Sequence, residues 1–442
     1  MSLTPPESVQ KLRAALHAKA KESPNYRFYA LYDKVYRPDV LAYAYSCCKS
    51  NRGAAGVDGQ DFDDIEAYGI QRWLGELTQE LKEKRYRPEA VRRVYIPKAD
   101  GKQRPLGIPT VKDRVVQTAA VIVLDAIFEA DLQPEQYAYR SQRSAHGAIG
   151  QVYRLMRSGH DEVVDADLSG YFDSIPHAEL MTSVSRRISD GAMLHLLKMW
   201  LEQSVEEEDE QGNPQRTTRN KDQRRGTPQG APISPLLSNL YMRRFVLGWK
   251  VLGHQERFGA FIVNYADDFI ICCRRGQAPH AMAAMRNMMG KLGLTVNEAK
   301  TRICSLPKDS FDFLGYTIGR CWSPRTGISY LGVRPSRKRI ASLRMALRQL
   351  TVKARACLEL GKVVSQMNRA LNGWANYFCL GTVSKAYREV DSHSRTRLRQ
   401  WLRRKHKLSS RATSWLPDEH LHLKLGLVCL QRRKSIHPCA KA

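Results

Sequence analysis

Two adjacent carboxylates, Asp267 and Asp268, interrupt the apolar stretch FIVNYADDFIICC at residues 261–273. Burying a carboxylate is costly unless the group is paired or coordinates a metal. An ordinary turn is the alternative explanation, because Asp favours tight turns. Strands this apolar belong in a core, however, and they would hold both carboxylates rigidly at the tip of a hairpin. The pattern therefore predicts a metal-binding turn between strands 261–265 and 269–273.

The stretch DEVVDADL at residues 161–168 supplies further carboxylates. It reads as a Val-rich strand whose side chains alternate between faces, so Asp165 and Asp167 share one face and Leu168 lies on the other. Magnesium is usually held by one or two carboxylates together with substrate phosphates. Two such ions about 4 Å apart clamp the attacking and leaving oxygens in phosphoryl transfer. Carboxylates from two neighbouring strands would suffice for that chemistry.

Several hairpins and helices are expected to position these groups. Residues 90–109 read as a hairpin whose turn is KADGKQ, with prolines limiting its second strand. Apolar residues at helical spacing predict helices over residues 1–50, 65–86 and 111–132. The Gly/Pro-rich turn GTPQGAPISP leads into another helix. Residues 204–225 change from acidic to basic and are expected to form a solvated loop or hairpin tip.

The chain carries 71 basic and 44 acidic residues in 442, a net charge of +27. A surplus of this size indicates a polyanionic partner, with nucleic acid first and a membrane surface second. No apolar run of about 18 residues is present to span a membrane. Residues 335–442 hold 24 basic and 5 acidic side chains, a net charge of +19. This part of the chain therefore predicts phosphate contacts and strongly salt-dependent binding.

Ten cysteines occur singly or as adjacent pairs, and no CxxC motif is present. We therefore expect reduced thiols and no structural zinc site. The first residues lack the charged start, apolar run and cleavage site of a secretory signal. Together with the length, these features predict a cytoplasmic protein of two or more domains.

Eight motifs follow one another along the chain. In chain order they are IPKADGKQRPLGIPTVKDRVVQ (96–117), YAYRSQRSAHGAI (137–149), VVDADLSGYFDSI (163–175), GTPQGAPISPLLSN (226–239), YADD (265–268), TVNEAKT (295–301), FDFLGY (311–316) and NGWANYF (372–378). In this order and at these spacings they resemble the reverse transcriptase and maturase proteins encoded by bacterial group II introns. The resemblance covers nearly the whole chain, and NGWANYF is similar to the signature of the maturase thumb.

The resemblance implies the catalytic groups. Asp167, Asp267 and Asp268 would be the catalytic carboxylates and would ligate two Mg²⁺ ions. Asp165 is the rival of Asp167. We favour Asp167 because the family's large aromatic residue, which excludes the wrong sugar, falls five residues later at Phe172.

Other residues are implied to contact the substrate. Lys98 and Arg104 flank the fingers turn and would grip the triphosphate of a dNTP, with plain surface charge as the alternative. Gln229 and Gly230 would lie beside the nascent base pair. Lys300 would protonate the leaving pyrophosphate as a general acid, with a solvated lysine as the alternative. The implied substrate-binding set is Lys98, Arg104, Leu168, Phe172, Gln229 and Gly230.

Helical spacing predicts three helices after FDFLGY, over residues 335–358, 361–378 and 385–405. With basic outer faces they would form a thumb that binds duplex phosphates or structured intron RNA. Trp374 and Phe378 of NGWANYF are expected in the helix core. The nucleic-acid-binding residues expected in this part are Arg337, Lys338, Arg339, Arg403, Arg404 and Lys405.

The fold expected is α+β: a right-hand polymerase with fingers and an antiparallel palm sheet, followed by an all-helical thumb. We expect an N-terminal helical extension and the start of the fingers at 1–85, and fingers and palm at 86–330. The thumb, or maturase domain, is expected at 331–410 and a basic tail at 411–442. The absence of CxxC pairs implies the subtype without an HNH endonuclease.

The implied function is that of an RNA-directed DNA polymerase that copies intron RNA during retrohoming and also binds that RNA as a maturase to assist splicing. Its partners would be group II intron RNA, an RNA/DNA template–primer duplex, a DNA target and dNTPs, in a cytoplasmic ribonucleoprotein with no membrane. One alternative is a reverse transcriptase recruited to phage defence or a CRISPR-linked role. Another is a maturase that only assists splicing.

Overall fold

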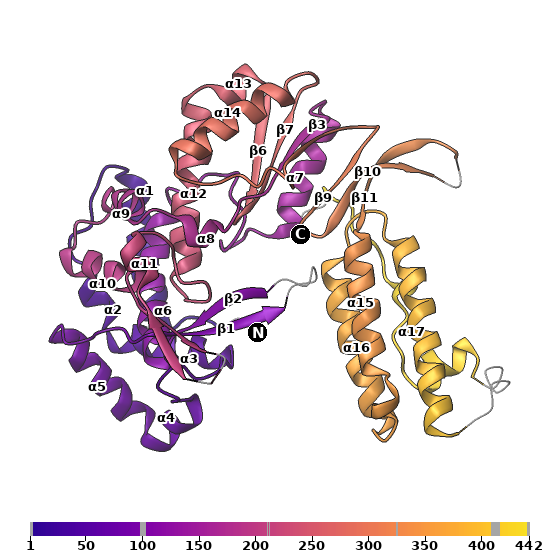
Figure 1. Cartoon of the computed structure of the whole chain (residues 1–442), viewed down its shortest axis with the longest axis horizontal. Helices are drawn as coiled ribbons and strands as arrows, with labels where there is room; N and C mark the ends of the chain where they lie inside the picture. Colours follow the sequence, from indigo (N-terminus) through magenta and orange to yellow (C-terminus); the bar gives the residue numbers. More distant parts are fainter. Residues whose placement is uncertain are drawn as a thin grey trace.

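Three clusters of buried apolar side chains organise the chain. The computed structural model describes residues 3–97, 103–209, 211, 213–323, 326–407 and 416–439. The first cluster joins the N-terminal helices to one face of a central sheet, and the second lies on the other face of that sheet. The third fills a separate helical unit near the C-terminus. Figure 1 shows this helical unit on the opposite side of the molecule from the N-terminal helices.

Helices account for most of the regular structure. They are α1 (Glu7–Glu22), α2 (Tyr32–Val35), α3 (Pro38–Ser50), α4 (Phe62–Tyr68), α5 (Ile70–Lys82), α6 (Val111–Phe128), α7 (Ala145–Arg157), α8 (Tyr171–Ser174), α9 (His177–Ser185), α10 (Gly191–Leu201), α11 (Arg219–Gln223), α12 (Ser234–Val251), α13 (His254–Arg257), α14 (Ala278–Lys291), α15 (Arg337–Leu350), α16 (Leu360–Tyr377) and α17 (Ser384–Lys405).

The strands form three small sheets in the part of the chain that the structure describes. They are β1 (Val91–Pro97), β2 (Gln103–Ile108), β3 (Glu162–Ala166), β4 (Val205–Glu208), β5 (Pro214–Thr217), β6 (Ala260–Tyr265), β7 (Asp268–Cys273), β8 (Arg302–Ser305), β9 (Ser310–Phe313), β10 (Tyr316–Trp322) and β11 (Ser329–Pro335).

The central sheet has the order β6-β7-β3-β8, and every pair in it is antiparallel. Alternating side chains divide its two faces, as strand geometry requires. Val164 and Ile271 pack in the first cluster, whereas Val163 and Ile270 pack in the second. Helix α14 packs on β3 and β7, and α7 on β6 and β7. The antiparallel palm sheet expected from the sequence is confirmed.

The fingers hairpin also forms as expected, with Ile96 opposite Arg104 in the β1–β2 register. It extends into a sheet of order β2-β1-β4-β5, in which β4 and β5 make the expected hairpin within residues 204–225. Further along the chain, β9, β10 and β11 form an antiparallel sheet that leads into the helical unit.

Three helix boundaries differ from expectation, and the helix predicted over 111–132 ends at Phe128. The helix predicted over 65–86 is two helices, α4 and α5, because Gly69 adopts a φ of +105° between them. The helix predicted over 335–358 ends at Leu350. There the Arg397 guanidinium donates to the carbonyl oxygens of Thr351 and Arg348, at 3.0 and 3.4 Å, and Val352 is extended. The Thr351 hydroxyl also donates to the Leu347 and Arg348 carbonyl oxygens, so these two carbonyls near the end of α15 are satisfied without further helix.

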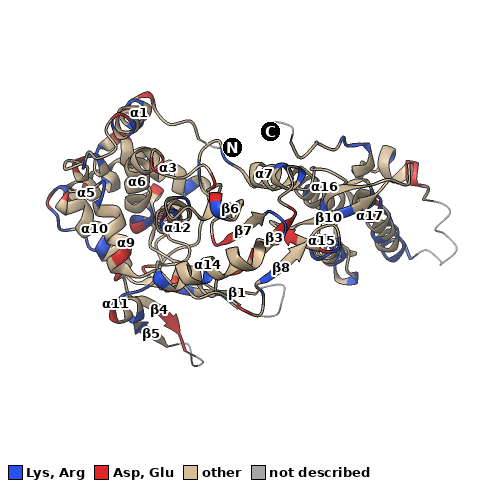
Figure 2. Cartoon of the chain, turned by 90° about the horizontal axis from the view of Figure 1, so that it is seen from above, with Lys and Arg blue, Asp and Glu red and all other residues tan. Residues whose placement is uncertain are grey.

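Helices α15, α16 and α17 pack around Leu347, Met367, Leu371 and Trp401, all of them fully buried. Figure 2 shows Lys and Arg recurring along these helices, with few acidic residues between them. Within the described ranges, no helix is long and apolar enough to cross a membrane.

Candidate active site

The two acidic residues of YADD lie at the tip of the β6–β7 hairpin. Asp268 opens β7 and pairs in register with Tyr265, so the turn itself consists of Ala266 and Asp267. Ala266 adopts a left-handed φ of +57°. The buried Asn264 side chain donates from Nδ2 to the Ala266 carbonyl oxygen at 2.7 Å. This hydrogen bond offsets part of the strain and fixes the direction in which the turn presents its carboxylate.

Asp167 follows directly after β3, the strand that pairs with β7, and so lies beside the start of β7. Its Oδ2 accepts hydrogen bonds from Lys300 Nζ at 3.1 Å and Asn297 Nδ2 at 3.0 Å. Its rival Asp165 instead pairs with Arg302, whose Nε lies 3.4 Å from the Asp165 Oδ2. Asp165 thus contacts the neighbouring strand β8, and of the two residues only Asp167 lines the cavity described next.

One cavity of about 980 Å³ brings the expected active-site residues together. Its walls come from the palm sheet, the β2 strand, the turn before α12 and the C-terminal end of α3. Among the expected site residues, those that line it are Arg104, Asp167, Leu168, Phe172, Gln229, Gly230, Asp267, Asp268 and Lys300. Lys98 lies outside the described residues.

Negative charge is concentrated at this point. Desolvation by the surrounding protein, together with the nearby carboxylates of Asp267, Asp167 and Asp165, raises the pKa of Asp268 to about 6. The Asp268 side chain is nevertheless open to the cavity. Carboxylates that repel one another and remain accessible favour a divalent cation between them.

The donor set fits magnesium, since it consists of carboxylate oxygens beside an open cavity. Among the described residues, no three His, Cys, Asp or Glu side chains lie together as a ready-made metal cage. Magnesium retains waters and takes substrate phosphates as ligands, so one or two carboxylates per ion are enough. Asp267, Asp268 and Asp167 are the groups available to hold it.

The fingers hairpin docks on the 226–235 turn through backbone contacts. Gly107 N of β2 donates to the Gln229 carbonyl oxygen at 2.6 Å. Gly230 has a φ of +107°, and a Cβ at that position would lie 2.4 Å from the Gly107 carbonyl oxygen. Glycine is therefore required for this close approach. Because Arg104 lies on β2, the contact sets its position relative to Gln229.

The wall beside Asp167 is also held by the backbone. Leu168 forms an isolated antiparallel bridge with Val296. The Phe172 carbonyl oxygen accepts a hydrogen bond from Thr227 N at 2.7 Å, which joins short helix α8 to the 226–235 turn. Phe172 lines the cavity and is only partly buried. It packs against the first apolar cluster on one side and borders the cavity on the other.

Among the cavity residues that sequence reasoning missed, two stand out. Asn297 lies three residues before Lys300 in the motif TVNEAKT. This short spacing was the available signal that the two side chains could reach the same carboxylate, that of Asp167. Tyr139 lines the cavity with a left-handed φ of +56°, although more than half of the residue is exposed. No residue pattern marks such a conformation in advance. A strained, exposed aromatic near Asp267 is typical of a functional position.

The basic residues expected to bind nucleic acid fall into two groups. Arg337, Lys338 and Arg339 are exposed at the start of α15. In contrast, Lys405 Nζ donates to the carbonyl oxygens of Leu358 and Ala356, at 2.7 and 3.4 Å. Arg404 donates to the Thr351 carbonyl oxygen at 3.5 Å, and Arg403 has a buried Nε. The second group is therefore partly engaged in holding the 351–358 segment.

The maturase motif lies where the helical unit meets the palm. Phe378 is buried, but in the second cluster and not in the core of the helical unit as expected. Trp374 is partly buried between the second and third clusters and packs against Phe378 with ring centroids 4.9 Å apart. Tyr377 donates from its hydroxyl to the Leu314 carbonyl oxygen at 2.8 Å. The aromatic residues of NGWANYF thus join α16 to the turn between β9 and β10.

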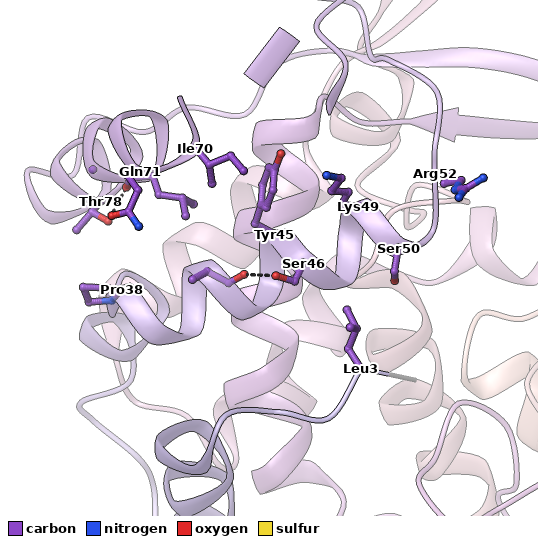
Figure 3. A pocket seen from close by; sticks show the side chains of 13 residues that line it. Leu3, Pro38, Tyr45, Ser46, Lys49, Ser50, Arg52, Ile70, Gln71 and Thr78 are labelled. Carbon is purple, nitrogen blue, oxygen red and sulfur yellow. Dashed lines mark hydrogen bonds between the residues drawn. The ribbon is translucent and has the colours of Figure 1, made fainter. Parts of the chain in front are cut away.

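A second cavity, of about 930 Å³, lies on the opposite face of α3 (Figure 3). Tyr45, Ser46 and Lys49 of α3 face Ile70 and other residues of α5 across it. Its lining includes no acidic residue, so it lacks ligands for magnesium. The carboxylate-lined cavity is therefore the candidate active site.

Comparison with known proteins agrees with this assignment. The model of the reverse transcriptase (RNA-dependent DNA polymerase) family matches residues 96–318, and that of the group II intron maturase-specific domain matches residues 340–416. Protein YkfC of Escherichia coli K12 is 32% identical over 348 residues, which are 71% of this chain and 88% of YkfC.

The group II intron-encoded protein LtrA of Lactococcus lactis is 34% identical over 233 residues, which are 52% of this chain and 37% of LtrA. The match thus spans little more than a third of that longer relative. Two family models in tandem, and a relative matched over most of its length, agree with the geometry of the cavity. The chain belongs to the group II intron-encoded reverse transcriptases, RNA-dependent DNA polymerases that also carry a maturase-specific domain.

Proposed function

We propose that the protein copies group II intron RNA into DNA by nucleotidyl transfer assisted by two magnesium ions, as a step of retrohoming. The observation that carries this proposal is the single cavity shared by Asp167, Asp267, Asp268, Phe172, Gln229 and Arg104. A cavity with carboxylates on one wall and Arg104 on another suits a substrate that carries both metal-bound phosphates and a sugar.

Each wall of the cavity would do a separate task. Asp267, Asp268 and Asp167 would hold the ions, which when bound neutralise developing charge on the attacking and leaving oxygens. Arg104 would bind the triphosphate, since its planar fork matches phosphate oxygens. Lys300 lies close enough to Asp167 to hold a proton for the leaving pyrophosphate.

The sugar and base would be positioned from the other side. Phe172 would close the floor beneath the sugar. Gln229 would contact the nucleotide next to the nascent base pair, and its Nε2 donates to the Asp173 Oδ2 at 3.2 Å. Gly230 would allow the backbone to approach the base pair closely. Lys98 would be a second ligand of the triphosphate, an assignment that rests only on its place in the fingers motif at residues 96–117.

We also propose maturase activity, the binding of intron RNA to assist its splicing. The match to the maturase-specific domain model and the net charge of +19 over residues 335–442 support it. RNA is recognised largely through its shape and backbone, which suits a basic helical surface. The boundaries proposed for this unit, 331–410, enclose α15, α16 and α17. A DNA target and a cytoplasmic ribonucleoprotein remain part of this proposal.

Primer extension tests the polymerase proposal. A DNA primer annealed to an RNA template is incubated with dNTPs and Mg²⁺, with a matched reaction that contains EDTA. We expect extension that depends on the metal and on all templated dNTPs. A purified, folded chain that binds the duplex without extending it would leave a splicing-only maturase as the better account.

A further inference from the structure

Residues 416–439, here called the strap, run back along the helical unit after α17 and end against the palm. Leu421, Leu427 and Leu430 of the strap are buried in the third cluster, among the side chains of α15, α16 and α17. Asp418 pairs with Arg399 at 2.6 Å and with Arg395 at 3.1 Å. The strap is thus packed and paired along its first half.

Asp391 of α17 is the main anchor of the strap. This residue is fully buried, and its Oδ1 accepts a hydrogen bond from Leu430 N at 2.9 Å. Its Oδ2 accepts from Gln431 N at 3.0 Å and from Gln431 Nε2 at 3.2 Å. A buried carboxylate is tolerated only when such donors surround it. The burial of Asp391 therefore depends on the strap staying in place.

Three amide side chains of α16 extend the attachment. Asn368 donates to the Gly426 carbonyl oxygen at 2.8 Å and accepts from Val428 N at 2.9 Å. Arg433 of the strap donates to Asn372 and Asn376, at 2.8 Å in both cases. Specific polar contacts at successive positions fix the register of the strap on the helices.

The end of the strap contacts the palm. Ile436 N donates to the Cys379 carbonyl oxygen, and the Ile436 carbonyl oxygen accepts from Gly381 N, both at 2.8 Å. The His437 ring then lies 5.5 Å from that of Tyr153 in α7, edge to face. A Cβ at Gly150 of α7 would lie 2.5 Å from the Pro438 carbonyl oxygen. Only glycine at position 150 allows the strap to lie this close to the helix.

We propose that the strap holds the thumb at a fixed position relative to the palm and thereby determines how many nucleotides are added in each binding event. The inference rests on the proposed polymerase function. Without the strap, the thumb would be joined to the palm through the NGWANYF aromatics and the connecting sheet. Thumb opening would release the duplex more often, whereas the chemistry at Asp267 would be unaffected.

Two glycines of α7 provide a matched pair of variants for the test. Gly150→Ala places a Cβ against the Pro438 carbonyl oxygen, whereas a Cβ at Gly147 meets Tyr137 at an ordinary 3.5 Å. Both substitutions raise helix propensity, so neither should impair folding of α7. A third variant that ends at Lys434 removes the palm contact outright. Hydrogen exchange over residues 426–438 reports whether the strap has been released.

Extension is measured on an RNA template with a heparin trap, which limits each enzyme to one binding event. We expect Gly150→Ala and the shortened variant to reduce the mean product length several-fold. Single-nucleotide incorporation should remain at the wild-type rate, and Gly147→Ala should match wild type in both assays. Unchanged product lengths in the shortened variant would overturn the role of the strap. A wild-type chain without single-nucleotide extension would overturn the polymerase proposal and the strap's role with it.

Discussion

Lys300 Nζ lies 3.1 Å from Oδ2 of Asp167, and the same oxygen accepts a hydrogen bond from Asn297 Nδ2. The ammonium group is thereby held beside a carboxylate proposed to bind magnesium. Two roles are compatible with this geometry. Lys300 either donates a proton to the leaving pyrophosphate or only balances the charge of Asp167.

Substitutions of Lys300 distinguish these roles. We expect Lys300→Ala to lower the single-turnover rate of incorporation by about 10²–10⁴-fold, the usual contribution of a general acid. Lys300→Arg keeps the positive charge but does not release a proton near neutral pH, so it should not restore the rate. The measurement is rapid-quench incorporation of one dNTP. Near-wild-type activity in Lys300→Arg would assign the residue to charge balance alone.

Gly230→Ala should separate the fingers hairpin from the 226–235 turn. The new Cβ would lie 2.4 Å from the Gly107 carbonyl oxygen, at a φ of +107°. Strain and overlap together are expected to cost about 3 kcal/mol or more. Incorporation should be lost, because Arg104 and Gln229 would no longer share a fixed geometry.

Gly59→Ala is the matched control for that change. Gly59 also has a positive φ, of +70°, but a Cβ there meets no atom within 4 Å. Urea denaturation should show a loss of about 1–2 kcal/mol for Gly59→Ala, with the rate of incorporation retained. Equal activity in the two variants would show that the contact between Gly107 and Gly230 has no part in positioning.

Stability should depend on pH through Asp113 of α6. Burial raises the pKa of this fully buried carboxyl to about 6, against the hydrogen bond that it accepts from Tyr86 at 2.6 Å. The folded state therefore keeps the proton to higher pH than the unfolded state. This contribution to stability is complete below about pH 4 and is lost as the pH rises through about 6.

Urea denaturation of wild type and Asp113→Asn at pH 4.5, 5.5 and 6.5 checks the effect. The free energy of unfolding of wild type, relative to the variant, should fall over this range by about 2 kcal/mol. A constant difference between the two proteins would contradict the assignment of a raised pKa to Asp113.

The basic residues of the thumb should behave as two groups. Replacing exposed Arg337 and Lys338 by Ala should lower the salt slope of RNA binding by up to about 1.5, the value for two phosphate contacts. Lys405→Ala should instead lower the free energy of unfolding by about 1 kcal/mol, because its bonds to the carbonyls of Leu358 and Ala356 are lost. Filter binding at several salt concentrations and urea denaturation measure the two effects. A slope that is unchanged in the double variant would count against phosphate contacts at the start of α15.

Much of the site follows from local sequence patterns. The apolar strands around Asp267 and Asp268 predict their hairpin, because strand periodicity and turn chemistry are local properties. For the same reason, the predicted start of this strand at residue 269 differs by only one residue from the observed start of β7 at Asp268. The fingers hairpin and the helices of the thumb could be predicted from the sequence in the same way.

Long-range contacts could not be predicted in this way. Asp391 looks like an ordinary charged residue of a basic helix, yet it is buried because backbone N–H groups some 40 residues later surround it. The premature end of α15 depends on Arg397, which lies on another helix. The left-handed conformation of Tyr139 is likewise set by its surroundings and not by its neighbours in sequence.

The assignment of Asp267 as a magnesium ligand is the central claim, and Asp267→Asn tests it most directly. Primer extension on RNA with Mg²⁺ is compared between wild type and the variant, alongside RNA binding by both. Loss of several kcal/mol of charge stabilisation should reduce extension by at least about 100-fold and leave binding nearly unchanged. Extension by Asp267→Asn at the wild-type rate would contradict the claim.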